Sequence, residues 1–173
     1  SPQGERGIQA RTGRECGREE IPRIFPAGGE GYPGEDGTLG RTDPGLINLD
    51  NPIGMDPADP ATADDRFYIN RVVVPVNRPV HLQLKARDVI HSFFLPHFRL
   101  KQDAVPGMTT QAWFRAGQTG SFDILCAEYC GERHSAMLAK LIVLPPQQFA
   151  QWYAGQPVEV AGLGAPSGKA AGL

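Results

Sequence analysis

Alternating apolar and polar residues limit what this chain can fold into more than any other feature of its sequence. In the segment 80–85 every second residue is apolar, namely Val80, Leu82 and Leu84. A period of two is typical of a strand with one face in a core and the other in water. Further short strands are expected over 67–74, 89–95, 111–115, 120–125 and 139–144. Short strands at this spacing predict an all-β fold, either an antiparallel sandwich or a barrel.

One helix is expected after the last strand. Pro145 and Pro146 suit the start of a helix, because the first helical positions need no N–H donor and the φ of proline is already helical. Three aromatic residues follow at i, i+3 and i+4: Phe149, Trp152 and Tyr153. A short helix here would lay its aromatic face on the strands.

Glycine and proline divide the chain into three parts. Of the 37 glycine and proline residues, 20 lie in residues 1–60, 10 in residues 61–153 and 7 in residues 154–173. We therefore expect a Gly/Pro-rich lead over 1–60, one domain over 61–153 and a flexible tail over 154–173. The lead is also acidic: between residues 30 and 65 it holds nine carboxylates and one base, Arg41. Such a segment is expected to wrap the domain as a solvated loop.

Charge and hydropathy exclude two classes of protein. The formal charge is −2, and the sequence has no basic arm, so nucleic-acid binding is not expected. The longest apolar runs are short and interrupted, as in 139–144. They fall well below the ~20 apolar residues that a membrane-spanning helix needs. The sequence as it stands predicts a soluble domain.

The residues that carry chemistry are concentrated in the segment 126–137. It holds two thiols, an imidazole and a thioether: Cys126, Cys130, His134 and Met137. Soft or borderline transition metals prefer these ligands, whereas magnesium and calcium prefer oxygen. A further imidazole, His91, stands among apolar residues on a separate predicted strand. We therefore predict a metal site in an end loop of the sandwich, where Gly131 allows a tight turn.

This ligand set favours copper over zinc. Zinc would accept two cysteines and two histidines but would gain nothing from Met137, and a mononuclear blue-copper site uses a single cysteine. Cys126 and Cys130 could instead bridge two copper ions, with one imidazole terminating each. Two such ions share one electron, which suits fast electron transfer. The alternative is a Cys126–Cys130 disulfide in an oxidising compartment, with no metal bound.

The remaining candidate ligands are not expected to join this site. His81 lies on the polar face of its predicted strand, and His97 is expected at the surface. Cys16 shows no C-x-x-C-H pattern, so no haem attachment is predicted there.

The run 89–144 closely resembles the copper A domain of cytochrome c oxidase subunit II. The resemblance rests on His91, on the motif from Lys101 to Gly107 and on the segment 126–137, and it extends more loosely from Tyr32 to Tyr153. It implies a cupredoxin-like Greek-key sandwich or barrel with a dinuclear copper centre. The copper ligands it implies are the side chains of His91, Cys126, Cys130, His134 and Met137 and the backbone carbonyl of Glu128. It also implies that the Glu128 side chain reaches a magnesium ion at the interface with subunit I.

The resemblance implies a function as well. Members of the family accept electrons from cytochrome c at the copper centre and pass them to haem in subunit I, which reduces oxygen. This chain would then be subunit II of a haem-copper terminal oxidase, the subunit where electrons arrive. It would lie on the extracytoplasmic face of a membrane, the periplasmic side of a bacterial inner membrane. An acidic surface with Asp103, Asp123 and Glu132 would receive the donor.

This sequence departs from the family pattern in two ways. Members usually begin with two membrane helices, so membrane association is expected through helices outside this sequence or through partner subunits. Members also carry a tryptophan-rich segment early in the domain, whereas only Trp113 and Trp152 occur here, so another c-type donor is an option.

Two functional alternatives stay open. One is the same copper centre in a nitric oxide or nitrous oxide reductase system, and the other is a copper carrier without electron transfer. Quinol oxidase subunits keep the fold but lack the thiols, so Cys126 and Cys130 argue against that class.

Overall fold

The computed structural model describes residues 8–10, 23–24, 30–32, 40–51, 54–63, 66–68, 70–155 and 158. Cys16, much of the expected lead and nearly all of the expected tail lie outside these residues. In the part of the chain that is described, no helix has the length and apolar character needed to cross a bilayer.

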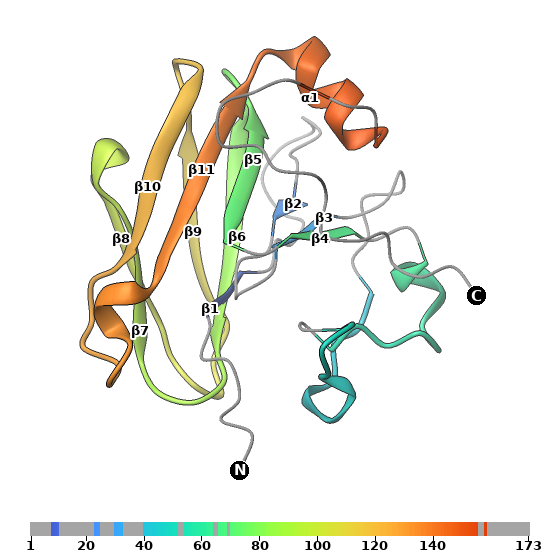
Figure 1. The fold of residues 1–173 in the computed structure, drawn as a ribbon, viewed down its shortest axis with the longest axis vertical. Coiled ribbons are helices and arrows are strands. Elements are labelled where there is room, and N and C mark those ends of the chain that lie inside the picture. Colours follow the sequence, from blue (N-terminus) through green and yellow to red (C-terminus); the bar gives the residue numbers. More distant parts are fainter. Residues whose placement is uncertain are drawn as a thin grey trace.

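A five-stranded sheet forms one layer of the domain (Figure 1). Its strands run in the order β5 (Arg71–Pro75), β11 (Leu138–Leu144), β10 (Gly120–Cys126), β7 (His91–Leu95) and β8 (Leu100–Ala104). Strand β10 pairs antiparallel with both β11 and β7. Strands β11 and β5 pair in parallel, which corrects the expectation of a purely antiparallel sandwich. A long crossover separates these two strands in sequence, and that is the condition a parallel pair requires.

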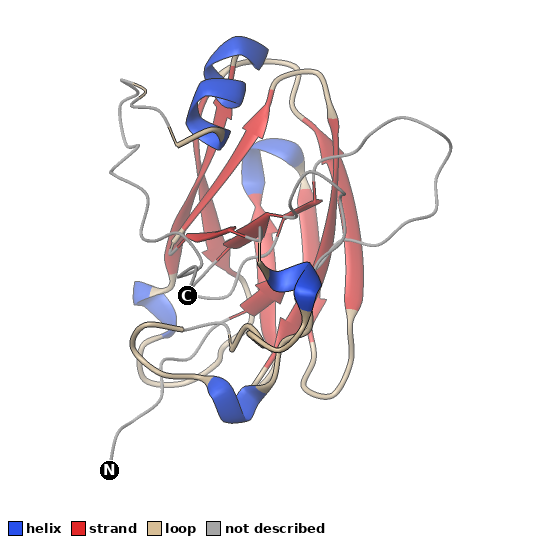
Figure 2. Ribbon diagram, turned by 90° about the vertical axis from the view of Figure 1, so that its right-hand side faces the viewer, coloured by secondary structure: helices blue, strands red, loops and turns tan. Residues whose placement is uncertain are grey.

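A second sheet is built around β6 (Pro79–Ala86). Strand β9 (Thr110–Arg115) pairs antiparallel with it, β1 (Ile8–Ala10) pairs antiparallel near its end, and β2 (Arg23–Ile24) pairs in parallel. A separate ribbon joins β3 (Glu30–Tyr32) and β4 (Arg66–Tyr68). Figure 2 shows the long strands of both sheets running along the length of the molecule.

The core lies between the two sheets. The predicted alternation in 80–85 is confirmed, since the three apolar side chains of β6 are fully buried. They meet buried side chains of the five-stranded sheet and of β9: Val72, Val73, Val74, Phe93, Leu95, Phe114, Leu141 and Ile142. Each such side chain stabilises the fold by about 1.5–3 kcal/mol through removal from water. The result is a rigid frame whose strand ends can hold a site.

The expected strand over 67–74 is broken in two. Asn70 lies between β4 and β5 with φ 59°, in the left-handed region that asparagine tolerates better than most residues. Strand β7 also begins at His91 rather than at residue 89, and Val89 and Ile90 are exposed on the preceding loop.

The predicted C-terminal helix is confirmed as α1 (Pro146–Tyr153). Trp152 is buried, and its ring lies 4.7 Å from that of Tyr68, centroid to centroid. The described residues also form four single-turn 3-10 helices: η1 (Pro44–Leu46), η2 (Pro60–Thr62), η3 (Pro96–Phe98) and η4 (His134–Ala136). The last of these belongs to the predicted metal-binding loop.

In the described part of the acidic lead, the base Arg41 pairs with carboxylates of the same segment. Arg41 pairs with Asp56 through its guanidinium at 2.7 Å, and its backbone N–H donates to Asp59 at 2.8 Å. Asp59 also caps η2 by accepting from the N–H of Ala61. These carboxylates therefore order their own segment.

Candidate metal centre

Two paired strands bring the first two predicted ligands together. His91 is the first residue of β7 and Cys126 is the last residue of β10. The register of this antiparallel pair places Cys126 opposite Phe93. Just beyond the pair, the N–H of Ala127 donates to the carbonyl of Ser92 at 3.0 Å. The ladder of the sheet thus fixes a histidine and a cysteine that lie 35 residues apart in sequence.

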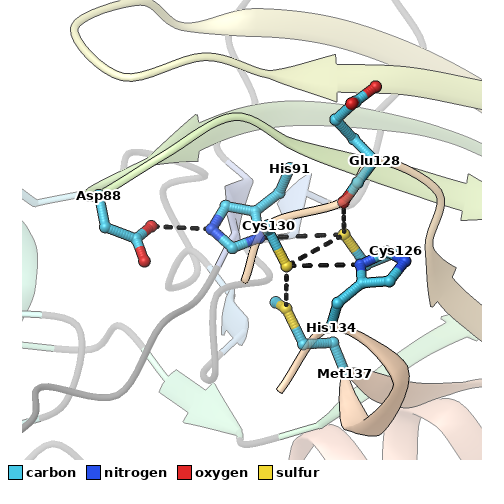
Figure 3. A network of polar contacts seen from close by, with 7 residues as sticks. All are labelled: Asp88, His91, Cys126, Glu128, Cys130, His134 and Met137. Carbon is cyan, nitrogen blue, oxygen red and sulfur yellow. Dashed lines mark hydrogen bonds and ion pairs between the residues drawn. The ribbon is translucent and has the colours of Figure 1, made fainter. Parts of the chain in front are cut away.

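The loop after β10 supplies the other predicted ligands. Gly131 has φ 119°, in the region that favours glycine, and this allows the chain to turn back after Cys130. Backbone hydrogen bonds from His134 to Gly131 (3.0 Å) and from Met137 to His134 (3.2 Å) close the turn η4. They place His134 and Met137 on the inner side of the loop, as Figure 3 shows.

All five predicted side-chain ligands converge (Figure 3). The Sγ of Cys126 lies 3.9 Å from Nδ1 of His91 and 3.9 Å from the Sγ of Cys130. The Sγ of Cys130 in turn lies 3.5 Å from Nδ1 of His134 and 3.1 Å from Sδ of Met137. The donor atoms of His91, Cys126 and Cys130 all fall within 4.8 Å of one another. The structure thus brings these five side chains together, and their role as metal ligands stays a prediction.

The sixth predicted donor is also in place. The backbone carbonyl of Glu128 lies 3.2 Å from the Sγ of Cys126, while the carboxylate of Glu128 extends away from the cluster (Figure 3). The backbone carbonyl of Glu128 therefore faces the thiols, whereas its carboxylate faces away from them.

Cys126 and Cys130 are both free thiols. Some residues of the site are buried, and others are partly exposed to solvent. His91 and Cys130 are buried, whereas Cys126 and His134 are partly exposed. Burial raises the pKa of the Cys130 thiol from 9.0 to about 11, and the nearby Cys126 adds to the rise. Two adjacent thiolates in a buried site repel each other, and a bound cation would offset both this repulsion and the desolvation. The site therefore favours a metal over two bare thiolates.

One member of the site, Asp88, was missed by the sequence analysis. Its Oδ1 lies 2.8 Å from Nε2 of His91, a buried imidazole. With Nε2–H donated to this carboxylate, Nδ1 is the nitrogen that faces the thiols with a lone pair. Burial opposes ionisation of Asp88, but hydrogen bonds from His91 and from the Val89 N–H outweigh it and hold the Asp88 pKa below its ordinary value. The position three residues before a candidate ligand was the only available signal.

The histidines set aside from the sequence lie elsewhere. His97 is exposed in η3 at the other end of β7, where its ring contacts that of Phe122. His81 is half-buried on β6.

The donor chemistry fits copper. Two thiol sulfurs lie at the centre of the cluster, one imidazole approaches each sulfur, and a thioether and a carbonyl complete the set. Magnesium or calcium would need oxygen donors, of which the cluster offers a single carbonyl. The thioether sits where a soft metal would gain a weak ligand and zinc would gain none.

Comparisons with known proteins agree with this site. Residues 60–144 match the family model described as "Cytochrome C oxidase subunit II, periplasmic domain". The chain is 44% identical over 121 residues to an alternative cytochrome c oxidase subunit 2 of Bradyrhizobium diazoefficiens, covering 69% of this chain and 44% of the relative. It is 51% identical over 89 residues to cytochrome c oxidase subunit 2 of Thermostichus vulcanus, covering 51% and 27%. The chain thus spans less than half the length of these curated relatives.

A solved structure shares the fold. The crystal structure of the periplasmic domain of subunit II of cytochrome oxidase (CoxB) of Bradyrhizobium japonicum aligns with a TM-score of 0.51 and 33% identity. The alignment covers 73% of this chain and 82% of that one. This similarity, together with the β architecture and the terminal helix, confirms the expected cupredoxin-like fold. The chain therefore belongs to the family of cytochrome c oxidase subunit II periplasmic domains.

Proposed function

We propose that this chain is the electron-accepting domain of a haem-copper terminal oxidase. It would take electrons from cytochrome c, or from another c-type donor, at a dinuclear copper centre and pass them to haem in subunit I. The observation that carries the proposal is the convergence of two thiols on two imidazoles and a thioether at the end of one rigid sheet.

The proposed copper ligands are the side chains of five residues and one backbone carbonyl: His91, Cys126, Cys130, His134, Met137 and Glu128. Two copper ions bound there would supply a one-electron couple shared between both metals. The protein contributes rigidity, because His91 and Cys126 are fixed by the sheet and His134 and Met137 by the hydrogen bonds of η4. A site that does not rearrange when its charge changes passes electrons with little reorganisation.

The surroundings of His91 support the same role. Asp88 holds the tautomer with Nδ1 as the donor nitrogen, and burial keeps water from that imidazole. The negative charge of Asp88 also offsets part of the positive charge that a metal brings to this side of the site.

The partners and location follow from the family and remain part of the proposal. Subunit I would lie against the domain, and the Glu128 carboxylate, directed away from the thiols, is the group we assign to a magnesium ion at that interface. The domain would sit on the periplasmic side of a bacterial membrane, held there by membrane helices or by partner subunits. Three parts are proposed for the chain: a lead over 1–60, the copper domain over 61–153 and a tail over 154–173.

One test separates a shared-electron copper centre from a copper carrier without electron transfer. The chain is loaded with copper, and the copper content and electron paramagnetic resonance spectrum of the oxidised protein are measured. Two coppers per chain with one unpaired electron coupled to both nuclei support the proposal. One copper with a localised spin, or copper that exchanges readily with a chelator, would indicate a carrier, because a buried site with six donors releases metal slowly.

A further inference from the structure

Strand β9 forms an open edge of the second sheet. Among the described residues it pairs with β6 alone. Its first residue is tied to the neighbouring strand β8, because the hydroxyl of Thr110 donates to the carbonyl of Asp103 at 2.5 Å. The rest of the strand, residues 111–115, has no strand on its other side in the part of the chain that is described. A row of backbone N–H and C=O groups is therefore available there for another strand.

The two edges of the five-stranded sheet are protected in ways that β9 is not. Natural edge strands usually carry charges or prolines, or are covered by another element. Strand β8 carries the exposed pair of Lys101 and Asp103, and β5 packs against helix α1. In β9, by contrast, residues 110–114 include no charged side chain and no proline. Nothing in the sequence of β9 thus opposes the addition of a strand until Arg115.

An exposed tryptophan stands at the middle of the open stretch. Trp113 is 71% exposed, although its neighbours Ala112 and Phe114 are buried beneath the sheet. Gln111 and Arg115 are exposed on the same outward face of the strand, one on each side of Trp113. Tryptophan is enriched at protein interfaces, where its large apolar area leaves water. The open edge and the exposed indole ring therefore coincide on one strand.

We propose that two copies of this chain pair through β9, strand against strand and antiparallel, with Trp113 on the twofold axis. Such an interface uses the same patch on both copies, so the strand must be complementary to itself. In this register Trp113 faces Trp113 of the second copy, and Gln111 faces Arg115 of the second copy at each end. No like charges stand opposite one another, which an antiparallel pair requires.

The length of the open stretch selects this register. Thr110 is already engaged by β8, and the strand ends at Arg115, so the middle of the available residues is Trp113. Opposed residues of an antiparallel pair share one face of the sheet, so the neighbouring symmetric registers are centred on Ala112 or Phe114. Either of these would leave one end of the stretch unpaired.

The pair is expected to be weak and to leave the candidate metal centre uncovered. A contact between two short strands lies at the low end of interface sizes, so we expect a dissociation constant on the order of 100 µM. The metal-binding loops lie at the end of the molecule where β9 begins (Figure 1). Antiparallel pairing places these loops at opposite ends of the pair, and neither copy covers the loops of the other.

The test measures self-association of the full chain by sedimentation velocity between about 10 µM and about 1 mM, a range that brackets the expected dissociation constant. A reductant is present, so that Cys126 and Cys130 cannot join two chains through a disulfide. Trp113→Ala removes the central ring, and Leu49→Ala is its control, because Leu49 is 97% exposed on a distant loop. Gln111→Lys sets a cation opposite Arg115, and Gln118→Lys makes the same change beyond the end of the strand.

We expect Trp113→Ala to raise the dissociation constant at least tenfold, as for truncation of an interface hot spot that both copies contribute. Gln111→Lys should weaken the pair about threefold, and Gln111→Glu, which faces Arg115, should strengthen it by a similar factor. The double variant Gln111→Lys with Arg115→Glu exchanges the two charges and should also pair more tightly than Gln111→Lys. Added salt should reduce all these charge effects.

The control variants Leu49→Ala and Gln118→Lys should associate like the unsubstituted chain. A chain that stays monomeric at about 1 mM would overturn the inference, and so would association that neither Trp113→Ala nor Gln111→Lys weakens. An equal loss in Gln111→Lys and Gln111→Glu would contradict the proposed register. Circular dichroism and thermal unfolding of the dilute proteins establish that each variant is folded. Copper content and the paramagnetic resonance spectrum should be the same in all variants, so failure of the pairing is distinguishable from failure of the proposed function.

Discussion

The backbone N–H of Ala127 donates to the carbonyl of Ser92 at 3.0 Å. Each of these residues directly follows a proposed copper ligand, Cys126 and His91. This one hydrogen bond therefore sets the separation of the two ligands more directly than any contact between their side chains. Ser92 is itself fully buried, and its hydroxyl donates to Asp103 on β8 at 2.7 Å.

Asp103→Ala should destabilise the domain, because it leaves the buried hydroxyl of Ser92 without its acceptor. An unsatisfied buried polar group costs about 1–3 kcal/mol. Urea denaturation of the metal-free protein near pH 7 measures the loss. The double variant with Ser92→Ala, which removes both partners, should recover part of it, and an equal or larger loss in the double variant would contradict this assignment.

The stability contributed by Asp103 should also depend on pH. Hydrogen bonds from Ser92 and then Lys101 lower the pKa of this carboxyl below its ordinary value of 3.8. A lowered folded-state pKa gives stability that is present above about pH 3.8 and is lost as pH falls through the folded-state value. The urea midpoints of the unsubstituted chain and of Asp103→Asn should therefore differ at about pH 6 and lie closer together at about pH 3. A constant difference between the two would count against the hydrogen-bond assignment.

Asp88→Ala should weaken copper binding without unfolding the domain. The carboxylate fixes the orientation of His91, and loss of such an outer partner typically costs about 10–100-fold in metal affinity. Competition with a copper chelator gives the affinity. Asp88→Asn keeps an oxygen acceptor, so its copper affinity should fall between those of Asp88→Ala and the unsubstituted chain. Asp50→Ala, on an exposed loop, is the matched control. Equal affinity in Asp88→Ala and the unsubstituted chain would show that the sheet alone orients the imidazole.

Met137→Leu should keep both copper ions and shift the reduction potential. The Sδ of Met137 lies close to Cys130, on the side away from Cys126, where it suits a weak axial ligand. Copper content and potentiometric titration followed by absorbance test this. Loss of copper in this variant would mean that the thioether is a strong ligand.

Trp152→Ala should lower the free energy of unfolding by about 3–5 kcal/mol, the usual cost of removing a large buried aromatic side chain. Trp152 joins α1 to the core through Tyr68, and its ring also packs on that of Phe149 in the same helix. Trp113→Ala, at an exposed position, should change stability by less than about 0.5 kcal/mol. Thermal unfolding of both variants makes the comparison, and similar losses in the two would contradict the packing of α1.

The sequence predicted those elements of the fold that depend only on the spacing of neighbouring residues. Strand β6 and helix α1 lie where alternation and helical spacing placed them. Strand β8 was missed, because Leu100–Ala104 mixes charged and apolar residues and only Ala104 is buried. The parallel pairing of β5 with β11 was also missed, since strand direction depends on the path of the whole chain.

The residues of the candidate site also divide into those that the sequence pattern predicted and those that it missed. The proposed ligands within 126–137 could be predicted because they are close in sequence and belong to types that bind soft metals. Asp88 was not visible, because its role depends on the orientation of the His91 ring, and a single aspartate in a loop carries no pattern. The contact between Tyr129 and His134 is likewise a product of the turn at Gly131.

The pairing of β7 with β10 also bears on when the protein could bind the proposed copper ions. One ligand precedes the other four side chains by 35 residues or more, and only the finished sheet brings it to them. A newly made chain therefore presents an incomplete ligand set until its tertiary structure has formed. Tight copper binding would for that reason indicate a correctly folded chain, and a chain whose sheet is misassembled would fail to retain the metal.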